Sequence, residues 1–83
     1  MTSTIEISLY PLRDDYPSHV IAFLTKLKVI PGIEISTNGM STILIGDYAL
    51  LWKHLGVLME EEMDSGSSLF VMKVAPERRE YVD

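Results

Sequence analysis

The sequence predicts an α+β fold of the ferredoxin-like βαββαβ type, with a four-stranded antiparallel sheet and two helices on one face of that sheet. Three observations lead to this prediction. Strand-like and helix-like stretches follow one another in the order β-α-β-β-α-β. Asn38-Gly39, between the second and third strand-like stretches, is a strong signal for a tight hairpin. A short internal echo, Ser3–Ile7 against Ser41–Ile45, has the spacing expected of two equivalent βαβ halves.

The first half of the chain is predicted to contain one strand and one helix. Apolar and polar residues alternate from Thr4 to Tyr10, as in a strand with one buried face, and Pro11 ends the strand because it cannot donate to a ladder. From Pro17 to Lys28 the apolar residues recur at helical spacing, and proline suits the first turn of a helix. Pro31-Gly32 ends this segment.

The hairpin that follows has two short strands, Ile33 to Thr37 and Ser41 to Gly46. The Asn38-Gly39 pair between them favours a two-residue type I′ turn, because both central positions of that turn need positive φ. The sequence therefore predicts an antiparallel pair of strands at this point.

The last part of the chain is predicted to contain a second helix and a fourth strand. Asp47 is a candidate N-cap for a helix from Tyr48 to about Met63. A serine-rich turn precedes the strand from Leu69 to Val74, which Pro76 closes. All these elements belong to one domain spanning 1–83, with an ordered core at about 4–76.

Composition and charge argue against several classes of protein. No apolar run approaches the roughly 18 residues that span a bilayer, so no membrane partner is expected. The absence of cysteine excludes a disulfide framework and cysteine-based zinc sites, and it fits a cytoplasmic location. A net charge of −5 argues against nucleic-acid binding, which needs a basic patch. The sequence contains no pattern that predicts a metal site or a cofactor.

Side-chain alternation predicts which residues face away from the helices. A two-residue turn pairs Thr37 with Met40 and thereby directs Thr42 toward the helices. The internal echo, which matches Ile5 with Ile43, would reverse the faces of the third strand, and we give more weight to the turn. The outward, open face is then predicted to carry Glu6, Ser8, Tyr10, Glu34, Ser36, Ser41, Ile43, Ile45, Leu69, Val71 and Lys73. This much apolar surface predicts that a ligand, another subunit or both cover the face.

Two stretches resemble the YkoF family. Ile7–Tyr16, with the letters ISLYPLRDDY, is similar to that family's SLYPM-x-DD-aromatic signature, and Met40–Gly46 resembles its I-S-T-x-L-x-G segment. The resemblance implies a ferredoxin-like protein that binds hydroxymethylpyrimidine or thiamine in thiamine salvage or transport. Family members with two tandem domains bind a ligand in each. Because this chain has one such domain, the resemblance implies a homodimer.

The chemistry of an aminopyrimidine selects candidate residues on the open face and beside it. Carboxylates would accept from the exocyclic amine, hydroxyls would bond to ring nitrogens or a hydroxymethyl group, and an aromatic ring would close one wall. Acidic side chains would also tolerate the thiazolium cation of thiamine. The candidate ligand-binding residues are Glu6, Ser8, Tyr10, Glu34, Ser41 and Thr42.

Two other functions stay open at this point. The domain could serve only for assembly, with its open face filled by a homo-oligomeric partner. It could also be a small enzyme, since Glu6 and Glu34 would form a carboxylate pair if they were neighbours in space. No nucleophile elbow, Ser-His-Asp arrangement or Cys-His pair is visible in the sequence, so we expect a binding protein and not an enzyme.

Overall fold

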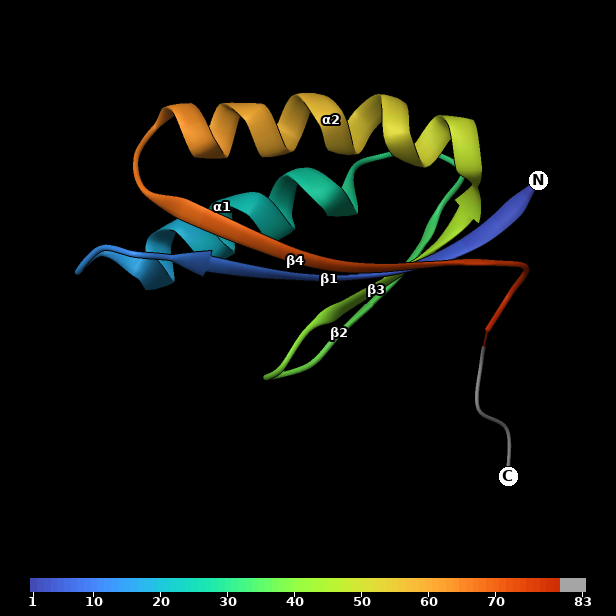
Figure 1. The fold of residues 1–83 in the computed structure, drawn as a ribbon, viewed down its shortest axis with the longest axis horizontal. Helices are drawn as coiled ribbons and strands as arrows, with labels where there is room; N and C mark the ends of the chain where they lie inside the picture. Colours follow the sequence, from blue (N-terminus) through green and yellow to red (C-terminus); the bar gives the residue numbers. More distant parts are fainter. Residues whose placement is uncertain (80–83) are drawn as a thin grey trace.

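The computed structural model describes residues 1–79, apart from the side chain of Tyr16. Two helices lie on one face of a four-stranded sheet and leave the other face open (Figure 1). The strand order is β2-β3-β1-β4, and each neighbouring pair is antiparallel. This arrangement confirms the predicted ferredoxin-like fold. The elements are β1 (Thr2–Pro11), α1 (Tyr16–Lys28), β2 (Glu34–Thr37), β3 (Thr42–Asp47), α2 (Tyr48–Asp64) and β4 (Ser68–Pro76).

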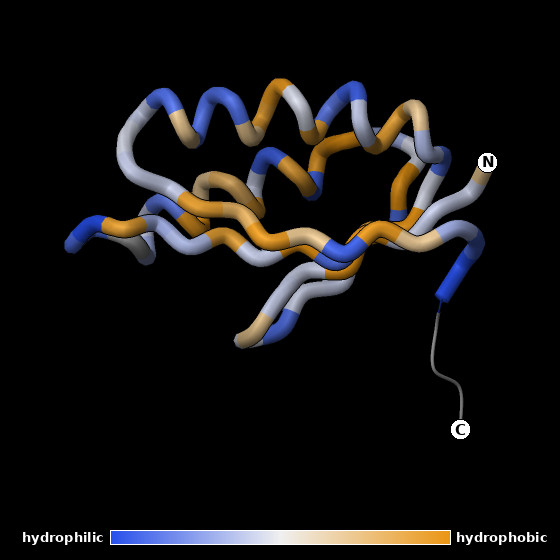
Figure 2. The backbone as a smooth tube through the Cα atoms, in the orientation of Figure 1, coloured by the Kyte–Doolittle hydropathy of each residue, from blue (hydrophilic) through white to orange (hydrophobic). Residues whose placement is uncertain are grey.

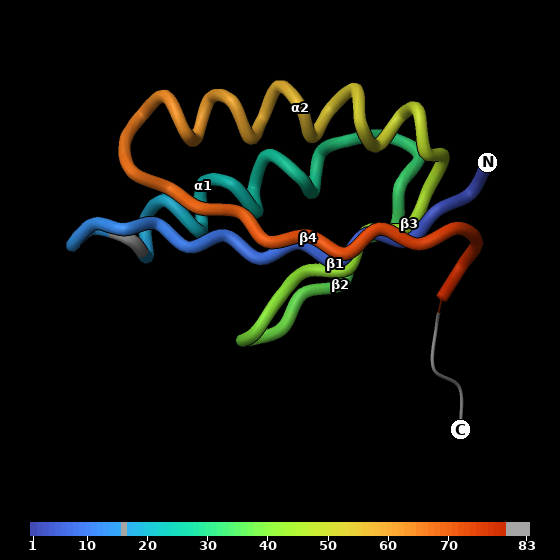
Figure 3. Tube along the Cα trace, in the orientation of Figure 1, coloured from blue at the N-terminus to red at the C-terminus, as the bar shows by residue number. Residues whose placement is uncertain are grey.

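β1 is the long central strand of the sheet. It pairs with β4 from Ser3 to Pro11 but with β3 only from Thr2 to Ile7. The chain path shows the tip of the β2–β3 hairpin bending away from β1 (Figure 3). As a result, the last residues of β1 have a strand neighbour on one side only.

The core lies between the sheet and the two helices. Phe23 and Leu27 of α1 and Leu51 and Leu55 of α2 pack onto the inward residues of β1 and β3. The rings of Phe23 and Phe70 lie 5.2 Å apart between centroids, which joins α1 to β4. Strongly hydrophobic residues gather along the strands under the helices (Figure 2). Each fully buried Leu or Ile contributes about 1.5–3 kcal/mol relative to exposure. The buried core comprises Ile5, Ile7, Phe23, Leu27, Ile30, Leu44, Leu51 and Leu55.

The hairpin turn differs from the prediction. Four residues, 38–41, connect β2 and β3, and of the described glycines only Gly32 has positive φ. Asn38 closes the turn with its side chain, because Oδ1 accepts hydrogen bonds from the amides of Met40 at 2.7 Å and Ser41 at 3.1 Å. The type I′ turn was therefore a wrong prediction. An Asx-type turn, in which a side-chain oxygen stands in for a backbone carbonyl, takes its place.

The predicted faces of the sheet survive this change. Thr37 pairs with Thr42 and not with Met40, a shift of two positions that leaves every side chain on its face. Ile5 pairs with Leu44, so the internal echo with Ile43 was the wrong guide. The other half of the chain follows its predicted cap, since Asp47 accepts a hydrogen bond from the Leu50 amide at 3.2 Å.

Part of the open face is covered by the chain itself. After β4, Glu77 adopts φ 66° and donates its amide to the Thr2 carbonyl at 2.8 Å. The Thr4 hydroxyl then donates to the Glu77 carbonyl and accepts from the Arg79 amide, both at 2.8 Å. We call residues 77–79 the C-terminal clamp. Thr4 and Ile45 point outward by register but are buried, which corrects the prediction that Ile45 belongs to an open surface.

Candidate functional site

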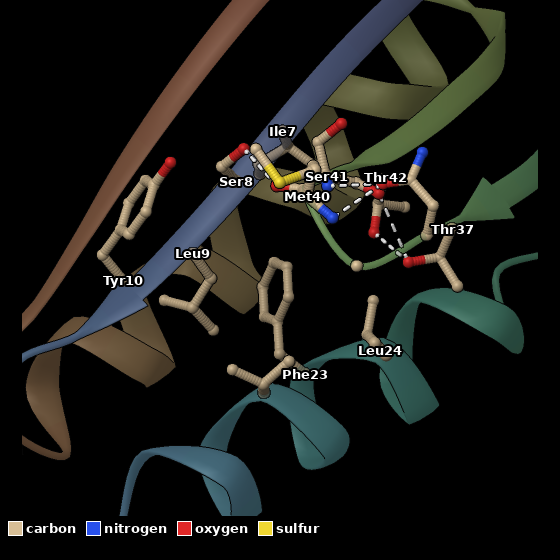
Figure 4. Close-up of a pocket in the computed structure, with 13 residues that line it drawn as sticks. Ile7, Ser8, Leu9, Tyr10, Phe23, Leu24, Thr37, Met40, Ser41 and Thr42 are labelled. Carbon is tan, nitrogen blue, oxygen red and sulfur yellow. Dashed lines mark hydrogen bonds between the residues drawn. The ribbon is translucent and has the colours of Figure 1, made fainter.

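A cavity of about 310 Å³ opens where the pairing of β1 with β3 stops. It lies beyond the last β1–β3 pair, Ile7 with Thr42, and is enclosed by the end of β1, the hairpin tip and one face of α1 (Figure 4). The fold creates this space because the hairpin bends away while α1 continues under β1. This volume lies at the small end of the range for ligand pockets in proteins.

The walls of the cavity divide into an apolar side and a polar side. α1 and the inward residues of β1 supply apolar side chains, including the ring of Phe23, while the hairpin tip supplies hydroxyl and amide groups. Tyr10 is half-exposed and stands at the mouth on the β1 side. The lining residues are Ile7, Ser8, Leu9, Tyr10, Val20, Phe23, Leu24, Thr37, Asn38, Gly39, Met40, Ser41 and Thr42.

Side-chain hydrogen bonds hold the hairpin tip beside β1. The Ser8 hydroxyl donates to the Met40 carbonyl at 3.4 Å, and the Ser41 hydroxyl donates to Glu6 Oε2 at 3.3 Å. The hydroxyls of Thr37 and Thr42 lie 2.8 Å apart at the inner end of the tip. These contacts fix the polar wall in place without a continuous ladder.

Four of the six predicted ligand-binding residues meet at this cavity. Ser8, Tyr10, Ser41 and Thr42 line it. Glu6 does not line it but contacts Ser41, and its Oε1 lies 3.9 Å from Lys73 Nζ. Whether any of these side chains contacts a ligand stays a prediction.

Glu34 lies away from the cavity, at the C-terminal clamp. Its Oε2 is 2.6 Å from Arg78 Nη1, and the hydrogen bond from Arg78 holds the pKa of this carboxyl below its usual value. Glu34 sits opposite Ile45, whereas Glu6 sits opposite Ile43, and β3 separates the two carboxylates. Strands two positions apart are about 10 Å apart across a sheet. Glu6 and Glu34 are therefore not the close pair that the enzyme alternative required.

The Glu34–Arg78 pair predicts how the clamp responds to acid. Because the folded pKa of Glu34 is lowered, its contribution to clamp stability is complete above the unfolded value of 4.5 and is lost as pH falls through the folded pKa. The amide chemical shift of Arg79, which reports the bond to Thr4, should move as the pH is lowered through this range. In the Glu34→Gln variant this pH dependence should disappear. An unchanged titration of the Arg79 amide in that variant would contradict the prediction.

Sequence reasoning missed the apolar wall of the cavity. The helical spacing of apolar residues predicted the helix but did not single out Phe23 and Leu24 as part of a pocket, and Asn38 was predicted only as a turn residue. The available signal was the register: once Thr42 is paired with Ile7, the residues after Ile7 have no partner on that side. The hairpin loop length, which sets this register, was predicted two residues too short.

A polar cluster ties the two helices and β4 together at the end of the sheet where β1 ends and β4 begins. His19 Nδ1 lies 2.9 Å from Glu62 Oε1, and His19 Nε2 lies 3.2 Å from Asp15 Oδ2. Ser68 also donates to Glu62 Oε1, at 3.1 Å. Arg13 hydrogen-bonds Asp15 and thereby lowers the pKa of that carboxyl. Glu62 is almost fully buried whereas Asp15 is exposed, so this cluster links α1, α2 and β4 from the interior out to the surface.

Two absences apply to residues 1–79. No group of three or more His, Asp or Glu side chains is placed to hold a metal ion. No helix in this part of the chain is long and apolar enough to cross a membrane.

Comparison with known proteins identifies the fold. No protein-family model and no curated protein matches the sequence. Protein SP2199 from Streptococcus pneumoniae superposes with a TM-score of 0.84 at 15% identity, covering 94% of this chain and 89% of that one. TM0486 from Thermotoga maritima, provisionally assigned to thiamine biosynthesis or salvage, has a TM-score of 0.80 at 11% identity over 93% and 85% of the two chains. A DUF77 domain of unknown function from Bacillus cereus has a TM-score of 0.74 at 20% identity over 93% and 77%. At these identities the likeness shows the fold, and the YkoF resemblance stays a prediction.

Proposed function

We propose that this protein binds thiamine or its hydroxymethylpyrimidine moiety in the cavity between β1, the hairpin tip and α1, and serves thiamine salvage or transport without catalysis. The observation that carries the proposal is the convergence of Ser8, Tyr10, Ser41 and Thr42 on one cavity whose opposite wall holds Phe23. Flat heteroaromatic ligands need an apolar or aromatic wall and a few placed hydrogen-bonding groups.

The charge of the lining supports a neutral ring as the bound group. Tyr10 is the one ionisable side chain among the described residues that line the cavity, which also favours a binding role over acid–base catalysis. Glu6 accepts a hydrogen bond from Ser41 and so brings a negative charge beside the polar wall of the cavity. The small volume favours the pyrimidine as the enclosed part, with the thiazolium of thiamine reaching outward on the side of Glu6.

Homodimerisation through the open face belongs to the same proposal. Tyr10, Leu69 and Val71 are each about half-exposed on the part of the face that the C-terminal clamp leaves free. A second copy placed there would cover these side chains and the mouth of the cavity beside Tyr10. The T. maritima protein of the same fold supports a connection with thiamine.

Calorimetric titration with hydroxymethylpyrimidine and with thiamine tests the proposal. We expect saturable binding, weakened about tenfold by Tyr10→Ala because one wall of the cavity is lost. Glu6→Gln should weaken binding less, since Glu6 reaches the cavity only through Ser41. Sedimentation of the same samples reports the oligomeric state.

The matched control is Leu69→Ala. Leu69 lies directly opposite Tyr10 on β4, is about as exposed and does not line the cavity, so its loss should leave affinity unchanged in samples that keep the oligomeric state of the unaltered protein. Absence of binding of either compound to the folded protein would refute the proposed function. Equal losses in Tyr10→Ala and Leu69→Ala, with the oligomeric state unchanged, would place the ligand elsewhere on the open face.

A further inference from the structure

The main chain of β1 offers an unpaired donor and acceptor beside the cavity. In an antiparallel sheet the N–H and C=O of one residue point to the same side, and successive residues alternate. The Thr2 carbonyl and the Leu12 amide bond toward the β4 side, to Glu77 and Ser67, while the Met1 carbonyl bonds to Tyr48 at the β3 side. Even-numbered residues of β1 therefore face β4, and odd-numbered residues face β3.

Leu9 is the residue whose main-chain N–H and C=O this alternation directs to the β3 side, where no strand pairs with it. The β1–β4 register is continuous from Ser3 to Pro11, so no bulge interrupts the alternation. Ile5 and Ile7 pair with Leu44 and Thr42 of β3, and Thr42 is the residue at which β3 begins, so the pairing goes no further. The next odd residue, Leu9, lines the cavity, and among the described residues no hydrogen bond is found for its amide or carbonyl. Pro11, the one after it, has no amide hydrogen.

From this placement we infer that the N–H and C=O of Leu9 bind the edge of the ligand ring as a donor–acceptor pair. This inference rests on the proposed function. An aminopyrimidine carries a ring nitrogen that accepts and a neighbouring exocyclic amine that donates. The two groups lie on one edge and complement the amide and carbonyl of a single strand residue, in the way that an added β-strand would. The ring then lies between Phe23 and the hairpin tip.

Main-chain recognition of this kind makes the ligand's own hydrogen-bond pattern the source of specificity. Replacing the exocyclic amine by a carbonyl turns the ligand's donor into an acceptor, which faces the Leu9 carbonyl without a hydrogen between them. A buried polar group that loses its partner costs far more than an exposed one. The oxo analogue of hydroxymethylpyrimidine should therefore bind about tenfold more weakly than the amino compound.

The experiment compares these two pyrimidines by calorimetry and follows backbone amides by NMR. With the amino compound, the Leu9 amide signal should shift strongly at saturation. The Ile5 amide is the internal control, because it points to the same side of β1 but is already bonded within the Ile5–Leu44 pair. It should shift little.

Two variants at position 9 separate the amide from the side chain. Leu9→Ala keeps the N–H and removes apolar packing, while Leu9→Pro also removes the N–H, at a strand edge where no ladder bond is lost. We expect Leu9→Pro to bind about tenfold more weakly than Leu9→Ala. If Leu9→Pro does not fold, the analogue pair and the amide shifts in the unaltered protein still decide the question.

The outcomes distinguish the inference from the function on which it rests. No binding of either pyrimidine refutes the proposed function itself. Saturable binding with equal affinity for the amino and oxo compounds, and an unmoved Leu9 amide, leaves the function standing and overturns recognition by Leu9. Preference for the amino compound together with a shifted Leu9 amide supports it.

Discussion

Replacing Leu44 by alanine is expected to lower the free energy of unfolding by about 2–5 kcal/mol. Leu44 is fully buried at the centre of the sheet, where it pairs with Ile5 on one side and Ile35 on the other. A domain of this length has a total stability of roughly 4–12 kcal/mol, so the loss consumes a large part of it. Urea denaturation followed by circular dichroism measures the change through a lowered midpoint.

The matched control for this prediction is Val71→Ala. Val71 is also an aliphatic strand residue, but it lies on the open face and is half-exposed. At protein concentrations low enough for the monomer to predominate, its replacement should change stability by less than about 0.5 kcal/mol. A loss at Val71 as large as the loss at Leu44 would mean that the open face is already covered in solution, as the proposed homodimer requires, and the protein concentration dependence of unfolding would then identify the dimer.

Removing the carboxylate of Glu62 is expected to cost about 1–3 kcal/mol of stability. Glu62 Oε1 serves both His19 and Ser68, and the Glu62 side chain is only 10% exposed. Glu62→Ala leaves both partners without their acceptor in a largely buried place. The effect is measured by thermal or urea unfolding at neutral pH.

Glu62→Gln distinguishes a hydrogen-bond role from a charge role. Glutamine keeps an oxygen in the same position and can still accept from Ser68. If hydrogen bonding accounts for the contribution, the Gln variant should lose less than half of what the Ala variant loses. Equal losses would show that the negative charge beside His19 supplies the stability.

The overall fold was predictable because its signals are local. One element each is predicted by the alternation in β1, the helical spacing from Pro17 to Lys28 and the Asp47 cap. The predicted ends of the elements lie within two residues of those observed. Right-handed connections between the strands then place both helices on the same face of the sheet. The hairpin turn escaped prediction because Asn38 favours two structures: a left-handed backbone before glycine, and a side-chain bridge to the next amides.

The candidate site was predictable only in part, because it depends on distances between segments. Alternation placed Ser8, Tyr10 and Ser41 on the same face of the sheet, and the structure brings them to the same cavity. It could not reveal that the longer hairpin loop places Glu34 opposite Ile45, where Arg78 contacts it after the turn at Glu77. The main-chain N–H and C=O of Leu9 cannot be identified from a pattern of side chains.

β3 begins only at Thr42, so it does not pair with β1 beyond Ile7, and this has a consequence for how the protein tolerates mutation. A binding group made of main-chain atoms is supplied by every amino acid except proline, so substitutions at position 9 alter packing but preserve the donor and the acceptor. The cavity itself follows from the path of the hairpin, which the side chains of Asn38, Ser8 and Ser41 hold in place. A lineage built on this scaffold could therefore drift far in sequence while keeping the same recognition edge, and similarity between distant members would be easier to detect in their backbones than in their letters.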